Sequence, residues 1–259
     1  MWWIEAALAL PADCGSSDAM KRPRVRNRQK GASWQRDPEG MRTRILGAAT
    51  MEFARYGFGG ARLNRIAKTA GANKRMIYYH VGDKEALYLA VLEGAYDHIR
   101  AAERRLNLEE LGAGQAIVKL LTFTWQYFLE NPEFLSLLNE ENQHRARHLR
   151  HSRKVKGLHS PFVDLIADIL RRGEASGELR KGIDPVQFYI SLAALSYFYQ
   201  SNSATLSVIF GRDLLSEDAK AERLAHMTDL VLAALRPAAT DTLDPELLTP
   251  IEFNQRVKI

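Results

Sequence analysis

A run of cationic and aromatic residues lies within residues 61–84. Five positions in it are expected to be exposed and to present hydrogen-bond donors or rings: Lys74, Arg75, Tyr78, Tyr79 and His80. Lys and Arg can donate to guanine edges or to phosphates, and Tyr hydroxyl and His N–H groups can reach the nucleic-acid backbone. A helix that reads a DNA groove requires side chains of this kind.

Two short helices are predicted to position these side chains, over residues 62–70 and 74–79. Gly71 lies in the turn between them and can adopt a positive φ, and Asn73 can cap the second helix. Small or apolar residues allow the two helices to pack closely: Ile66, Ala67, Ala70, Met76 and Ile77. Two short helices joined by a tight turn with a glycine form a helix-turn-helix.

The rest of the chain also shows helical periodicity. A first helix is predicted from Asp37-Pro38 to a stop at Gly57, and a long one follows Asp83 to about residue 106. Later helices are predicted over residues 115–130, after Asn131-Pro132, over 160–176, from Asp184-Pro185 through Tyr199, and over 216–235. Because alternating strand patterns are nearly absent, the predicted fold class is all-α. It has a three-helix helix-turn-helix domain followed by a helical C-terminal domain.

The composition fits a protein of one or two domains inside a reducing compartment. The 259 residues are 46% hydrophobic and carry a formal net charge of +5, which suits a polyanionic partner. The single cysteine, Cys14, excludes an internal disulfide framework. No apolar run is long enough to span a bilayer, so we predict a cytoplasmic location and no membrane partner.

The N-terminal residues are not expected to belong to the fold. Residues 1–10 are apolar but lack a basic start, which argues against a signal peptide, and Met20 is a second candidate for the biological start. Residues 21–36 carry seven cations and no acid, so residues 1–36 are predicted to be a disordered basic arm. The arm could touch the minor groove or serve only solubility. Residues 237–259 are predicted to be a tail.

Residues 45–92 resemble the DNA-binding domain of the TetR family of regulators. Four stretches together carry the resemblance: Phe53 with Tyr56-Gly57-Phe58, Ile66-Ala67 with Ala70-Gly71-Ala72-Asn73, Ile77-Tyr78-Tyr79-His80-Val81, and Lys84-Glu85-Ala86-Leu87. Ala72-Asn73 stands where Val-Ser is commoner in this family, and Val81 stands where Phe is common. Neither change should abolish the fold, because Asn still caps and Val still packs.

The resemblance implies roles for matching positions. Lys74 and Arg75 occupy base-reading positions, and Asn64 can reach a base or a phosphate. Phosphate contacts are implied for Arg62, which replaces a Thr or Ser of the family, and for Tyr78, His80 and Lys84, with Tyr79 on the same DNA-binding face. Tyr78 could equally pack against the first helix. The implied domains are 37–84 for DNA binding, 85–106 as connector helix, and 107–236 for ligand binding and dimerisation.

Two further sites are implied in the helical C-terminal domain. In this family the aromatic-rich middle of the chain encloses a small-molecule pocket, for which the candidates are Trp125, Phe128, Asn139, Gln143, Tyr197 and Gln200. An ordinary aromatic core would show the same residues. The last two helices of the family pair with their copies in a four-helix bundle, and the candidates are Leu192, Leu195, Tyr199, Leu224, Met227 and Val231. Burial within one protomer would give the same apolar stripes.

Two clusters suggest other chemistry less strongly. His144, His148 and His151 are spaced to share a helical face, but five Lys and Arg residues in the same segment oppose a metal ion, so we interpret this segment as a basic surface helix or loop. Glu140 and Glu141 suggest paired carboxylates, but nothing completes a catalytic site, so we interpret them as surface or helix-start charges. We therefore predict no metal, no cofactor and no enzymatic activity.

The combined prediction is a homodimeric transcription regulator that binds double-stranded operator DNA and acts as a repressor released by a small-molecule effector. A ligand-independent regulator or an activator of the same fold is the alternative within the family. An enzyme hidden in the helical domain and a nonspecific DNA-packaging protein are the alternatives of other classes.

Overall fold

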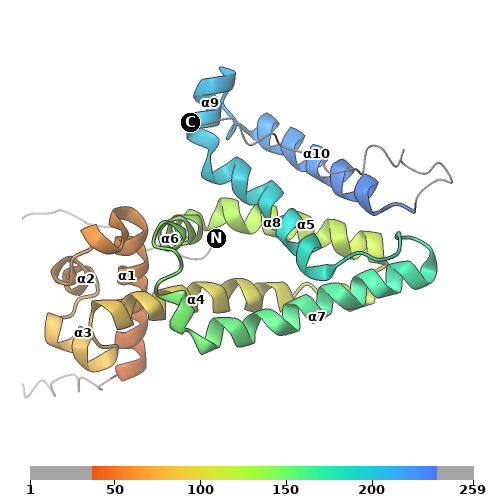
Figure 1. Ribbon diagram of the computed structural model, residues 1–259. Helices are drawn as coiled ribbons and strands as arrows, with labels where there is room; N and C mark the ends of the chain where they lie inside the picture. The colour runs from red at the N-terminus through yellow and green to blue at the C-terminus, as the bar shows by residue number, and fades with distance from the viewer. Residues whose placement is uncertain (1–36, 238–259) are drawn as a thin grey trace, which may run out of the picture. The chain divides into compact units, whose positions relative to one another are not determined.

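The computed structural model describes residues 37–237, and within them it contains helices and no strand, which confirms the all-α class (Figure 1). The helices are α1 (Pro38–Gly60), α2 (Leu63–Thr69), α3 (Lys74–His80), α4 (Lys84–Arg104), α5 (Ala113–Glu130), α6 (Pro132–Gln143), α7 (Arg153–Ser176), α8 (Pro185–Ser201), α9 (Ser203–Phe210) and α10 (Glu217–Leu235). Two short 3₁₀ helices, η1 (Leu108–Glu110) and η2 (Leu149–His151), lie in the connections. The predicted basic arm, Cys14 and the tail beyond residue 237 lie outside the described residues.

The first helix begins and breaks where the sequence predicts. The Asp37 side chain accepts a hydrogen bond of 2.8 Å from the backbone amide of Gly40, and Pro38 occupies the first helical turn. Helical geometry breaks at Gly57, whose φ is 63°, and one more turn continues to Gly60. Glycine adopts such a φ without the steric penalty that a Cβ would bring.

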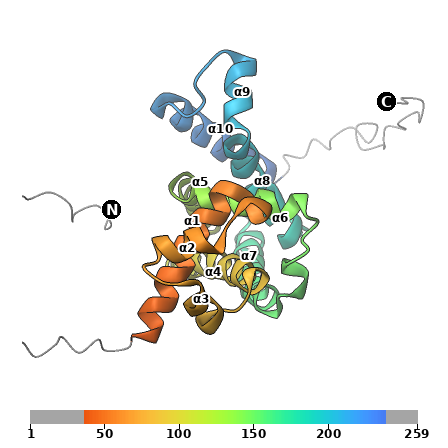
Figure 2. The same ribbon diagram turned by 90° about the vertical axis from the view of Figure 1, so that its left-hand side faces the viewer.

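Helices α1, α2, α3 and the first half of α4 share one hydrophobic core, and we call this part, residues 37–92, the head. Its buried side chains include Ile45, Phe53, Ile66, Ile77, Leu87, Tyr88 and Leu92. Figure 2 shows α1, α2 and α3 together on the side that faces the viewer. A buried aliphatic or aromatic side chain contributes roughly 1.5–3 kcal/mol of transfer free energy. The shared core therefore fixes the orientation of α3.

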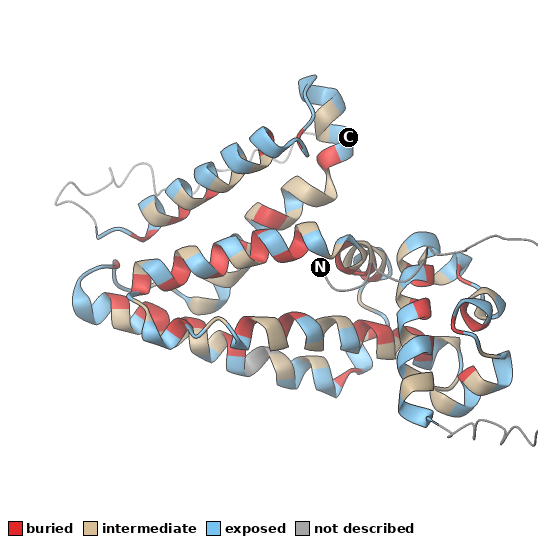
Figure 3. Cartoon of the chain, turned by 180° about the vertical axis from the view of Figure 1, so that it is seen from behind, coloured by how far each residue is buried: buried red, intermediate tan, exposed pale blue. Residues whose placement is uncertain are grey.

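The remaining helices form a second core, and we call this part, residues 93–237, the body. Side chains from α5, α7, α8 and α10 are buried together, among them Leu120, Trp125, Ile166, Leu192 and Met227. A smaller aromatic cluster joins α4 to α5 and α6. Figure 3 shows buried residues as stripes along the facing sides of these helices. None of the helices in residues 37–237 is long and apolar enough to cross a bilayer.

Two sequence predictions about the helices were wrong. Helix α7 begins at Arg153, before the predicted start near Pro161, because Ser152 caps it by accepting a 3.1 Å hydrogen bond from the amide of Val155. Pro161 lies inside the helix rather than at its first turn. Helix α9 was not predicted, because the chain carries no glycine or proline to separate it from α8.

Candidate DNA-binding surface

Helix α3 is held at both of its ends. The Asn73 side chain accepts a hydrogen bond of 3.0 Å from the amide of Met76, and Gly71 adopts a φ of 62° in the turn before it. At the other end, Arg42 of α1 donates from Nη1 to the backbone carbonyl of His80 at 2.7 Å. The cap was predicted, whereas the Arg42 contact joins residues far apart in the chain and was not.

One face of α3 is buried and the opposite face presents donors and rings. Ile77 is fully buried, while Lys74, Arg75, Tyr78 and Tyr79 are exposed. Tyr79 is 83% exposed, so most of its side chain is accessible. The Lys74 amine lies 5.9 Å from the Tyr78 ring centroid. The structure thus brings these predicted residues together on one accessible helix.

Tyr78 and His80 are placed differently from the fully exposed residues. Tyr78 is 49% exposed, so part of its ring contacts the protein and part remains accessible, as both interpretations of this residue allow. His80 is half-buried at the end of α3, with its ring centroid 5.0 Å from that of Tyr79. The rings of Tyr78 and His80 are therefore both partly accessible on α3.

The start of α2 is fixed by a carboxylate of α1. Glu52 accepts hydrogen bonds from the backbone amide of Arg62 at 2.9 Å and from Nε of Arg65 at 2.7 Å. Burial alone would raise the pKa of Glu52, but the hydrogen bonds from Arg65 and Arg62 outweigh it and lower that pKa. Arg65 is thereby committed to the fold, whereas the side chains of Arg62 and Asn64 are exposed at the predicted contact positions.

The start of α4 borders the same surface. Asp83 accepts a hydrogen bond of 2.8 Å from the amide of Ala86 and caps the helix as predicted. Lys84 is half-buried, with its amine 4.9 Å from the centroid of the Phe58 ring. Lys84 thus packs partly against α1, whereas the side chains of Lys74 and Arg75 are exposed.

The prediction that Glu140 and Glu141 are surface or helix-start charges was wrong. Both lie at the C-terminal end of α6, where Glu140 accepts a 2.6 Å hydrogen bond from the amide of Phe58 in α1. Glu141 is buried and accepts hydrogen bonds from the amides of His148 and Leu149 and from Nδ1 of His148. The two carboxylates fasten the body to the head and order the connection between α6 and α7.

The three histidines of this connection have separate environments. His148 is buried beside Glu141 and packs its ring 4.7 Å from the Tyr88 ring centroid, so its expected place on a basic surface was wrong. His144 and His151 are exposed. Within residues 37–237 no three potential ligands are grouped for a metal ion.

Comparison with known proteins matches both parts of the chain. Residues 45–91 match the model of the bacterial regulatory proteins of the tetR family, and residues 114–231 match the tetracyclin repressor-like C-terminal domain. The HTH-type transcriptional repressor NicS of Pseudomonas putida is 39% identical over 195 residues, which cover 75% of this chain and 92% of NicS. The chain belongs to the TetR family. Its relatives are transcriptional regulators rather than enzymes.

Other TetR-family proteins match at greater distance. The regulator RutR of Escherichia coli is 26% identical over 193 residues, covering 74% of this chain and 89% of RutR. A solved structure of the putative regulator SCO4942 from Streptomyces coelicolor aligns with a TM-score of 0.58 at 24% identity, over 76% of this chain and 99% of that one. FadR of Bacillus subtilis, solved in complex with stearoyl-CoA, aligns with a TM-score of 0.56 at 16% identity, over 74% and 98%. The structures support the fold alone.

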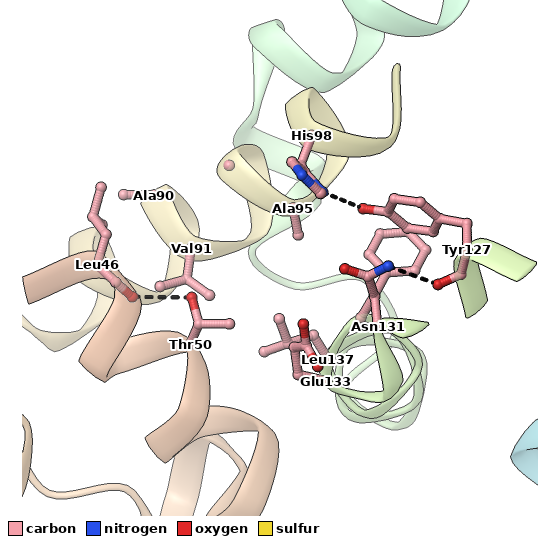
Figure 4. A pocket seen from close by; sticks show the side chains of 12 residues that line it. Leu46, Thr50, Ala90, Val91, Ala95, His98, Tyr127, Asn131, Glu133 and Leu137 are labelled. Atoms are coloured by element: carbon pink, nitrogen blue, oxygen red, sulfur yellow. Dashed lines mark hydrogen bonds between the residues drawn. The ribbon is translucent and has the colours of Figure 1, made fainter. Parts of the chain in front are cut away.

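A cavity of about 240 Å³ lies where the head of this TetR-family chain meets its body (Figure 4). Leu46 and Thr50 of α1 and Val91 of α4 face Asn131 and Leu137 across it. Its polar edge includes Tyr127, whose hydroxyl lies 2.8 Å from Nδ1 of His98. Burial raises the pKa of Tyr127, so the hydroxyl stays protonated and can hydrogen-bond. We call this space the junction cavity.

The six predicted ligand-site residues lie on α5, α6 and α8, and two hydrogen bonds link four of them. The Tyr197 hydroxyl donates to Oδ1 of Asn139, and Nε2 of Gln200 donates to the carbonyl of Trp125 at 3.0 Å. The side chains of Trp125 and Phe128 are buried in the core, as the aromatic-core alternative holds. Gln143 is exposed at the end of α6. None of the six lines the junction cavity.

The six predicted dimer residues divide by burial. Leu192, Met227 and Val231 are buried within the protomer, as the alternative interpretation of their stripes holds. They therefore offer a partner little surface. Leu195, Tyr199 and Leu224 are half-buried.

The exposed apolar side chains of α8 lie on another stripe, at four-residue spacing: Val186, Ile190, Ala194 and Phe198. Next to it, α8 and Leu230 of α10 line a groove of about 490 Å³.

Proposed function

We propose that this chain represses transcription as a homodimer that binds operator DNA, and that a small-molecule effector releases it. The exposed face of α3 is the observation that carries this proposal. Lys74 and Arg75 stand in the first turn of a helix whose opposite side is anchored by Ile77, so their side chains can enter a major groove while the head stays packed. Because the proposed target is operator DNA, we also propose that the protein acts in the cytoplasm.

Dimerisation is supported by the apolar face of α8 and α10. Val186, Ile190 and Phe198 are between 45% and 59% exposed, and they form a continuous stripe beside the groove that Leu230 borders. Large exposed apolar patches on a folded chain mark interaction sites. A two-fold dimer through this face would present two copies of α3, which suits half-sites about 34–36 Å apart.

Regulation is proposed to act through the head–body junction. Helix α4 contributes Leu87 and Val91 to the head core and Ile99 to the aromatic cluster of the body. A ligand that binds one arrangement of the body better than another increases the population of the arrangement that it favours. Because α4 belongs to both cores, the head would move with it. The junction cavity leaves α1 space to shift against α4 and α6.

Operator binding can be tested on DNA that the native protein selects from a random-sequence pool. We expect Lys74→Ala with Arg75→Ala to weaken binding at least about 10-fold at fixed salt, since each good base contact is worth about 1–3 kcal/mol. The control is Lys119→Ala with Lys181→Ala, which removes two exposed cations of the body. Equal affinity of both double variants would reject the assignment of α3 as the reading helix.

A further inference from the structure

The body contains a pair of charged side chains, Arg100 and Glu103, that are both buried. Arg100 and Glu103 of α4 are each 2% exposed, and Nη1 of Arg100 lies 2.7 Å from Oε2 of Glu103. Breaking a buried ion pair is costly, yet replacing it by apolar residues is often neutral or stabilising. Stability alone is therefore a weak reason for a guanidinium at this position.

The guanidinium of Arg100 is held between aromatic side chains of two other helices. Nη2 donates to the Tyr189 hydroxyl of α8 at 2.9 Å, and the guanidinium carbon lies 4.0 Å from the ring centroid of Phe162 of α7. The Phe162 and Tyr189 rings meet edge to face with centroids 5.2 Å apart. This arrangement orients the guanidinium but leaves part of its hydrogen-bonding capacity unused.

Three polar atoms of the pair lack a well-directed hydrogen bond. Within residues 37–237, Nε of Arg100 has no acceptor, and Nη1 of Arg100 and Oε2 of Glu103 have only their 2.7 Å ion-pair contact with each other. Residues three apart on one helix bring the charges close without aligning their N–H and C–O directions. Buried polar atoms in folded proteins are nearly always hydrogen-bonded, so these exceptions require an explanation.

Building on the proposed ligand-released repressor, we infer that Arg100 is the anchor for the effector, and that the effector is a small carboxylate with an apolar body. A carboxylate can accept two parallel hydrogen bonds from a guanidinium. Phe162 and Tyr189 would flank its apolar part. Because Arg100 lies on α4, the helix that also enters the head core, binding here acts on the element that carries the head.

When the ligand binds, its carboxylate would replace that of Glu103 as the partner of Arg100. Burial raises the pKa of Glu103 to about 7, against the opposing influence of Arg100 and Arg104. The Glu103 carboxylate can therefore take up a proton when a second carboxylate arrives, and its protonated form donates a hydrogen bond rather than repelling the ligand. The hydroxyls of Tyr96, Tyr127 and Tyr189 also lie near the pair.

The test measures ligand binding directly, by calorimetry on the full-length protein without DNA. The probes are benzoate, phenylacetate and hexanoate, each beside its neutral amide, at millimolar concentrations. We expect at least one carboxylate to bind about 10-fold or more tightly than its amide, because hydrogen bonds to charged groups are the stronger ones. Binding of none of the three, or equal binding of acid and amide, would overturn the inference.

Variants assign the binding to Arg100. Arg100→Met with Glu103→Leu replaces the whole pair by apolar residues, which keeps the core filled, and should reduce carboxylate binding at least about 10-fold while circular dichroism and operator affinity stay unchanged. Glu103→Gln alone should tighten carboxylate binding, since it removes the competing negative charge. Undiminished binding in the double variant would also overturn the inference, whereas the repressor proposal is judged separately by operator affinity.

Discussion

The carboxylate of Glu140 accepts a hydrogen bond of 2.6 Å from the backbone amide of Phe58, although 82 residues separate the two in the chain. The amide belongs to the residue after Gly57, where α1 leaves helical geometry. The break in α1 exposes an amide, and the end of α6 supplies its acceptor. Head and body are thus joined at a point where the head helix could not satisfy its own backbone.

Gly57 is expected to tolerate no side chain. Its φ of 63° disfavours any residue with a Cβ, and a Cβ there would lie 2.8 Å from Oε1 of Glu140. Gly57→Ala should therefore lower the free energy of unfolding by about 1–3 kcal/mol, as measured by urea denaturation. Gly47→Ala is the matched control on the same helix, because nothing lies within 4 Å of its Cβ position and the change should stabilise the helix. Equal effects at the two sites would refute the role of Gly57.

The dimer prediction rests on the exposed stripe of α8. Ile190→Glu places a carboxylate where we expect a partner helix, and burying an unpaired charge costs at least about 3 kcal/mol. We expect the variant to sediment as a monomer at concentrations where the native protein is a dimer, and to lose operator affinity with it. Met51→Glu makes the same change at an exposed apolar residue of α1 and should leave the dimer intact. A dimeric Ile190→Glu protein would move the interface elsewhere.

Local features of the head could be predicted from the sequence because each depends on neighbours in the chain. Asn73 and Asp83 cap their helices as expected, and Gly71 adopts the predicted positive φ. The buried side of α3 follows from the apolar character of Ile77 beside polar neighbours. Each of these features depends on residues at most about four positions apart, so it can be predicted without knowledge of the tertiary fold.

Features that depend on tertiary contacts could not be predicted from the sequence. No local pattern pairs Glu140 with Phe58, or Arg42 with the carbonyl of His80. The buried charge did leave a signal, since Glu103 continues the apolar face of α4 four residues after Ile99. A charged residue in line with an apolar stripe predicts a buried polar site. At Glu103 this pattern would also have drawn attention to Arg100, the charged residue one turn before it on the same helix.

Filling the junction cavity should stabilise the protein. Gly94 of α4 lines this cavity, and nothing lies within 4 Å of its Cβ position. Gly94→Ala should add about 0.5–1 kcal/mol to the free energy of unfolding through helix propensity alone. Gly94→Leu should exceed Gly94→Ala by about 1 kcal/mol, because the longer side chain covers apolar surface of α1 and α6. A leucine variant less stable than the alanine variant would mean that the space is needed by neighbouring side chains.

The buried Glu103 carboxyl should make stability fall as pH rises. Burial raises its pKa from 4.5 to about 7, with Arg100 and Arg104 acting in the opposite direction. Between these two pH values the folded chain binds a proton that the unfolded chain has released, so folding is favoured at the acidic end of the window and loses stability toward pH 7. The contribution is on the order of 3 kcal/mol across the window.

Urea midpoints at pH 5 and pH 7.5 can isolate the contribution of Glu103 from the other effects of pH on stability. The measured quantity is the difference between the native protein and Glu103→Gln, whose neutral amide cannot titrate. We expect that the native protein loses more stability than the variant between the two pH values. Glu174→Gln changes an exposed carboxyl of α7 and should follow the native profile. If Glu103→Gln and the native protein lose stability in parallel, the Glu103 carboxyl is ionised in the folded chain throughout this range.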